Sequence, residues 1–162
     1  MPPSAVVAHV ATPLLGVGTG LRSFTPIAVT AWFARKGRLP VEGTWASWVA
    51  HPASVGLFTA AALGEYVADK LPGTPNRTAP GPLAGRIALG GLVGAIVATS
   101  FRRPVVNGIV MGVVGAVVGS FGGYYLRRGL TKGAGLPDVP VALSGDAAAV
   151  AMAVGALGRL TE

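Results

Sequence analysis

The chain has 162 residues, of which 51% are hydrophobic and 12% charged, and its formal net charge is +7. A water-soluble domain carries about twice that charged fraction, so the composition argues against a soluble fold and for a membrane protein. The basic residues lie between apolar runs and not in one patch, which argues against nucleic acid as a partner. The absence of cysteine excludes disulfides and thiolate metal sites. The length allows one domain, residues 1–162.

The first apolar segment, residues 5–34, is too long for one straight helix across a bilayer. Thirty helical residues extend about 45 Å, against a hydrocarbon core of about 30 Å. Gly18, Gly20 and Pro26 disfavour helix, so we expect a break between Gly18 and Pro26. The segment is then either one kinked span or a re-entrant pair of short helices, and periodicity fits both.

Four later runs each reach the roughly 17–25 residues that a transmembrane helix needs. They cover residues 53–71, 84–100, 105–126 and 141–160. Pro104 suits a helix start, so the second and third of these runs are expected to form a tight antiparallel hairpin. The predicted fold is an all-α polytopic membrane protein with four full transmembrane helices plus a broken or re-entrant N-terminal helical segment.

The run 105–126 carries glycines on one helical stripe, namely Gly108, Gly112, Gly115 and Gly119. Glycines at this spacing let helix backbones approach closely, either within the chain or across a dimer. We expect a homo-oligomer, in the simplest case a dimer packed through this stripe. The basic residues of the connections, with Arg86 counted among them, divide evenly between the two sides, so the sequence predicts no membrane orientation.

Arg22 is a charged residue in an apolar stretch, at the point where we expect the helix to break. A guanidinium keeps its proton in a protein, so it needs an anion or carbonyl groups as partners. Arg22 is therefore either one half of an internal ion pair that holds the fold together or part of a site for an anion or a lipid headgroup. One residue can serve both purposes.

Glu65 and Asp69 lie one helical turn apart near the end of the run 53–71. A carboxylate costs several kcal/mol to hold in hydrocarbon, so it usually faces the protein interior or an aqueous cavity and has a partner. We expect Arg22 to contact Glu65, directly or through water. Asp69, three residues before Pro72, is alternatively a solvated residue at the membrane interface.

Three further charged residues fall on the predicted side of Glu65, namely Arg77, Arg86 and Asp146. Asp146 comes close to the start of the run 141–160, where a carboxylate complements the helix dipole. Capping is the interpretation that we favour for Asp146, and membership of a polar cluster with Glu65 is the alternative.

No pattern in the sequence indicates catalysis. His9 and His51 lack a second ligand at metal spacing, and no phosphate-cradling loop, nucleophile elbow or catalytic triad is recognisable. We therefore predict no catalytic residue, no metal and no cofactor.

Broken helices and ionisable residues at membrane depth often mark a substrate or ion pathway. The leading hypothesis is a small transporter or channel-like protein for an ion or small anionic solute. Arg22 would bind the anion, and Glu65 with Asp69 would supply a proton-linked or cation-coordinating counter-charge. The alternative is a non-transporting scaffold or lipid-binding subunit with structural charges, and a lipid-modifying enzyme comes third. Membrane lipid is an expected partner in each case.

Two polar signatures in a fixed order resemble a known family. They are Gly20-Leu-Arg-Ser-Phe-Thr-Pro26 and Glu65-Tyr-Val-Ala-Asp-Lys-Leu-Pro72, followed by a basic, proline-containing stretch to Arg86. With them, residues 10–160 resemble the bacterial integral-membrane family called domain of unknown function 4126. The resemblance implies a multi-helix protein of the bacterial inner membrane and no activity. The matching positions are Arg22, Pro26, Glu65, Asp69, Lys70 and Pro72.

Overall fold

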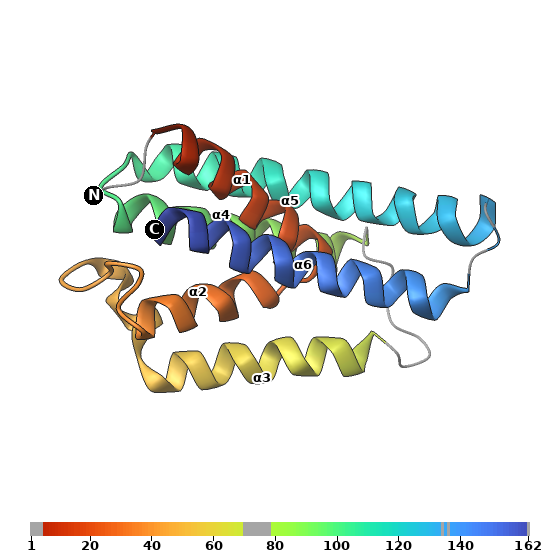
Figure 1. Ribbon diagram of the computed structural model, residues 1–162, viewed down its shortest axis with the longest axis horizontal. Helices are drawn as coiled ribbons and strands as arrows, with labels where there is room; N and C mark the ends of the chain where they lie inside the picture. Colours follow the sequence, from red (N-terminus) through yellow and green to blue (C-terminus); the bar gives the residue numbers. More distant parts are fainter. Residues whose placement is uncertain (1–4, 70–78, 134, 136, 162) are drawn as a thin grey trace.

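The computed structural model describes residues 5–69, 79–133, 135 and 137–161, and these residues are all-α. The elements are α1 (Ala5–Leu21), α2 (Thr25–Arg35), the short 3-10 helix η1 (Trp45–Ala50), α3 (Pro52–Ala68), α4 (Pro80–Ser100), α5 (Val105–Arg128), the π-helical turn η2 (Gly129–Gly133) and α6 (Asp138–Thr161). Figure 1 shows that the helices run roughly along one long axis. The predicted all-α class is confirmed.

Within the described residues, three stretches of helix are long and apolar enough to cross a membrane, namely Pro80–Ser100, Val105–Gly133 and Pro140–Thr161. They correspond to three of the four predicted spans. The fourth, the run 53–71, corresponds to α3, which has only 17 residues. At 1.5 Å per residue α3 is about 25 Å long, so it is not one of the three long apolar helices.

Residues 5–34 form two helices that run in opposite directions. α1 ends at Leu21 and α2 begins at Thr25, so the break falls at residues 22–24. In Figure 1, α1 runs from the end of the molecule where α6 finishes toward its middle, and α2 returns to that same end. The segment is therefore a pair of helices that reverses direction and not one kinked helix.

Gly18 and Gly20 do not break the helix, contrary to the prediction, because α1 continues through both. Gly20 instead lets α1 approach α5, since an added Cβ would lie well within 3.0 Å of the carbonyl oxygen of Ala116. Pro26 stands in the first turn of α2, where its missing amide hydrogen costs nothing. Of these three residues, only Pro26 lies where a new helix starts.

One half of the α5 glycine stripe packs against α4. An added Cβ at Gly108 would lie well within 3.0 Å of the carbonyl oxygen of Gly94, and one at Gly112 equally close to that of Gly90. Only glycine permits so close an approach of the two backbones. The tight turn between these helices, in which Arg102 adopts a φ of 52°, completes the hairpin that the sequence predicts.

The other half of the stripe packs against α1. An added Cβ at Gly115 or Gly119 would collide with the carbonyl oxygen of Pro13 or Val17, respectively. Helix packing through these glycines is thus confirmed, and it occurs within one chain. Because α1 and α4 cover the stripe, the expected dimer has no exposed surface there. Assembly through another face stays a prediction.

Candidate functional site: a buried charge cluster

Arg22 occupies the turn between α1 and α2 and is the centre of the site. Its side chain is only 3% exposed. Its Nε donates a hydrogen bond of 2.6 Å to Oδ1 of Asp146 on α6, and its Nη2 forms an ion pair with the same carboxylate. Its Nη1 donates to Oδ2 of Asp69, the residue that caps the C-terminus of α3. All three guanidinium nitrogens therefore have carboxylate partners.

Tyr66 contacts the Arg22 guanidinium with the face of its aromatic ring. The Cζ atom of Arg22 lies 4.7 Å from the centre of the Tyr66 ring, which is the geometry of a cation–π contact. The Tyr66 hydroxyl lies 3.2 Å from that of Thr25, the first residue of α2. Tyr66 thereby links α3 both to the charged group and to the helix that follows the turn.

Glu65 binds the backbone of the turn. Its Oε1 accepts the amide hydrogen of Ser23 at 2.8 Å, and its Oε2 accepts that of Phe24 at 3.0 Å. The first amides of a helix have no partner within the helix, and no side chain of α2 caps its own N-terminus. A carboxylate from α3 therefore satisfies the start of α2, where it also complements the helix dipole.

Arg86 completes the cluster from α4. Its side chain is buried, its Nε donates to the Ser23 hydroxyl at 3.2 Å, and its Nη2 lies 3.7 Å from Oε1 of Glu65. Arg86 is therefore not part of an exposed connection, because α4 begins at Pro80 and includes it. With Arg86 inside α4, the basic residues of the connections no longer divide evenly between the two predicted sides of the membrane.

The expected pairing of Arg22 with Glu65 is replaced by two separate pairings. Arg22 binds Asp69 and Asp146, whereas Glu65 binds the turn amides and Arg86. The reason is the direction of the groups at the turn. The amides that follow Arg22 face the carboxylate of Glu65, while the long Arg22 side chain extends to Asp69 at the C-terminal end of α3 and to Asp146 within α6.

The capping interpretation of Asp146 is wrong, and the alternative that it joins the cluster is right. α6 begins at Asp138, so Asp146 lies two turns inside the helix and too far from its N-terminus to cap it. Asp69 is not merely solvated either, because its side chain is 19% exposed and pairs with Arg22. Arg77 and Lys70 lie outside the described residues.

Tyr66 is a member of the cluster that was not predicted from the sequence. The signal that identifies it is its position inside the second polar signature, directly after Glu65 and one turn before Asp69. Among the described residues, no buried side-chain nitrogen or oxygen lacks a hydrogen-bond partner. An ion that binds to the buried atoms of this cluster would therefore compete with a partner that is already there.

Fold and cluster together define a helical protein whose described part holds three potential membrane spans and a buried set of charges at a helix break. The chain belongs to the family described as Domain of unknown function (DUF4126), whose model matches residues 10–158. Both polar signatures of the sequence fall within that range. No curated protein and no solved structure matches the chain significantly.

Proposed function

We propose that the chain is an integral membrane protein that moves a small ion or small anionic solute, and that the buried charge cluster is its binding site. The observation that carries this proposal is the helix break at residues 22–24. Its backbone amides bind Glu65 of α3, its Ser23 hydroxyl accepts a hydrogen bond from Arg86 of α4, and its guanidinium pairs with Asp69 and with Asp146 of α6. Interrupted helices supply ion and substrate sites in membrane transporters because they offer backbone groups that a continuous helix hides. Ionisable residues inside a membrane often mark the pathway itself.

Exposed apolar side chains support a membrane location. Four valines at helical spacing on α5 are each more than half exposed, namely Val106, Val110, Val114 and Val118. A continuous apolar face of this kind is unfavourable in water and suits contact with lipid chains. α3 also exposes Leu57, Leu63 and Val67, so we include α3 as a fourth span beside the re-entrant pair α1–α2. The bacterial inner membrane is the location that we propose.

Glu65 is the group that we propose to exchange with the transported ion. Arg22 already binds two carboxylates, so an added anion gains little there. The amides of Ser23 and Phe24, with Arg86 beside them, form a set of donors that one carboxylate now occupies. A proton taken up by Glu65 weakens these charge-assisted hydrogen bonds. A small anion can then take the place of the Glu65 carboxylate at these donors, so proton uptake and anion binding are linked.

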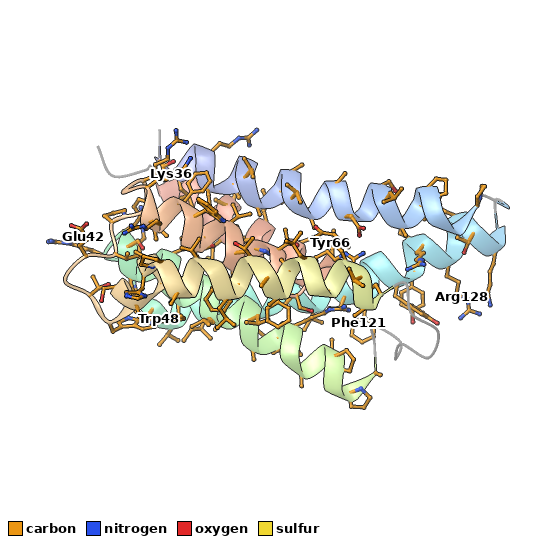
Figure 2. The ribbon with its side chains drawn as sticks, turned by 90° about the horizontal axis from the view of Figure 1, so that it is seen from below. Lys36, Glu42, Trp48, Tyr66, Phe121 and Arg128 are labelled. Atoms are coloured by element: carbon orange, nitrogen blue, oxygen red, sulfur yellow. The ribbon has the colours of Figure 1, made fainter. Side chains whose placement is uncertain are left out.

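Ion flux into proteoliposomes tests this proposal. Chloride, acetate and proton fluxes are measured for the natural chain and for Glu65→Gln, which removes the charge and keeps the shape. Glu42→Gln is the matched control, because Glu42 lies exposed at the far end of the molecule from the cluster (Figure 2). We expect at least a tenfold change in one flux for Glu65→Gln and none for Glu42→Gln. Equal fluxes for both variants would reject the role of Glu65, and fluxes of the natural chain no higher than those of protein-free liposomes would reject the transport function.

A second candidate function is a non-transporting scaffold in which the charges hold the helices together. The complete hydrogen bonding of the buried side chains in the described residues favours it. The two candidates differ in a measurable way. In a scaffold, Glu65→Gln and Asp146→Asn lower the thermal stability and leave every ion flux at the level of protein-free liposomes.

A further inference from the structure

A hollow of about 300 Å³ lies between α2 and α6, at the end of α2 that is distant from the charge cluster. Its lining combines apolar and aromatic side chains with two cations, namely Val29, Trp32, Phe33, Lys36, Arg38 and Val154. The guanidinium of Arg38 lies 5.7 Å from the centre of the Phe33 ring. The Trp32 indole is held by a hydrogen bond of 3.0 Å from Nε1 to the Thr59 hydroxyl.

Among the residues that the structure describes, no carboxylate pairs with either cation of the hollow. Within the described part of the chain, neither Lys36 nor Arg38 forms an ion pair, and both side chains are exposed. The carboxylate nearest to them along the sequence is that of Glu42, and Figure 2 shows Glu42 and Lys36 at separate parts of this end of the molecule. The hollow therefore presents uncompensated positive charge beside an apolar wall.

We propose that this hollow binds one anionic phospholipid. The phosphate of the headgroup lies against Lys36 and Arg38, and an acyl chain follows Val29 and Val154 toward the bilayer interior. Trp32 is then at the level of the headgroup, where indole rings are commonly found. Basic residues next to the end of a membrane helix attract anionic lipids, and the apolar wall distinguishes a lipid from a free anion. The proposal requires a membrane location but no transport, so it can fail or succeed independently of ion flux.

Thermal unfolding in neutral detergent micelles tests the charge requirement. Phosphatidylglycerol is added at increasing mole fraction, with phosphatidylcholine of the same acyl chains and inorganic phosphate as separate controls. We expect phosphatidylglycerol to raise the melting temperature of the natural chain, with half-saturation shifted at least about tenfold upward in the variant Lys36→Gln/Arg38→Gln. The matched control is Arg128→Gln/Lys132→Gln, which removes the same charge from exposed positions at the opposite end of the molecule.

Each outcome of the thermal unfolding experiment either supports or overturns the proposed lipid site. A shift confined to the Lys36/Arg38 variant supports the site. An equal shift in both double variants shows only general charge attraction and overturns it. Equal stabilisation by phosphatidylcholine overturns the requirement for an anionic headgroup, and equal stabilisation by inorganic phosphate overturns the lipid as occupant.

Fluorescence quenching tests the position of the lipid. The chain has three tryptophans, so the variant Trp45→Phe/Trp48→Phe leaves Trp32 as the single reporter. Phosphatidylglycerol with brominated acyl chains should quench Trp32 at a lower mole fraction than brominated phosphatidylcholine does. Lys36→Gln/Arg38→Gln in the same background should remove that difference. Identical quenching by both lipids in the parent background would place the anionic lipid elsewhere and overturn the proposal.

Discussion

Arg22 and Asp146 are 124 residues apart in the sequence and are joined by a hydrogen bond of 2.6 Å between Nε and Oδ1. This contact connects the turn between the first two helices to the last helix of the chain. Asp69, at the C-terminal end of α3, pairs with the same guanidinium. Arg22 thus connects the turn that it belongs to with both α3 and α6. The conformation of the turn therefore depends on residues that follow it by most of the length of the chain.

The first prediction concerns this pair. Asp146→Asn should lower the free energy of unfolding by about 3 kcal/mol, because it leaves Arg22 buried with one carboxylate fewer. Arg22→Met should also destabilise, since it strands two carboxylates. The double variant should lose less than the sum of the two single losses, as measured by unfolding in mixed detergent. Additive losses would show that the two side chains do not interact.

The second prediction compares two glycines on α5. Gly112→Ala should destabilise by about 1–3 kcal/mol or more, because the new Cβ meets the backbone of α4 at Gly90. Gly122→Ala is the matched control, since an added Cβ there has no atom within 4 Å. The control should be neutral or stabilising by up to about 1 kcal/mol, which is the helix propensity gained. Melting temperatures of the two variants provide the measurement, and equal values would contradict the packing.

The third prediction separates the two contacts of Tyr66. Tyr66→Phe removes only the hydroxyl that lies beside Thr25, so we expect a loss of about 1 kcal/mol. Tyr66→Leu also removes the ring next to Arg22, and we expect a further loss of about 1–2 kcal/mol. The difference between the two variants should disappear in an Arg22→Met background. If it persists there, the ring contributes by packing and not through the cation.

The fourth prediction concerns membrane topology and uses the absence of cysteine from the natural sequence. Single cysteines at Lys36 and Lys132 should react with a membrane-impermeant maleimide from opposite sides of oriented vesicles. A cysteine at Val114, in the middle of the exposed face of α5, should react only after the membrane is dissolved. Labelling of all three positions from one side in intact vesicles would contradict the proposed spans.

Local features of the helices were predictable from the sequence. Apolar runs between basic connections predict the long helices, and the spacing of Gly108 and Gly112 predicts close packing because both depend on residues near one another in the chain. The break near Arg22 was predictable for the same reason. The positions of Gly18 and Gly20 misled the prediction, because a glycine in a helix permits either a break or a close approach, and only the neighbouring helix decides which.

The partners of the charges were not predictable. Glu65, Asp69 and Asp146 are all chemically suitable for Arg22, and their choice depends on the direction of each group after the helices have packed. The start of α6 was also placed three residues too late, because Pro140, which lies in the first turn of α6, resembles a helix boundary in the sequence. The earlier start moves Asp146 away from the helix N-terminus, and the packing of α6 against the Arg22 turn makes it a member of the cluster.

The bond between Arg22 and Asp146 has a consequence for biosynthesis. Arg22 is synthesised 124 residues before Asp146. During that interval the Arg22 side chain lacks one of its two carboxylate partners. The turn between α1 and α2 can reach its final form only after α6 has been synthesised and has packed against it. A chain interrupted before α6 keeps a buried arginine that lacks one of its two carboxylate partners.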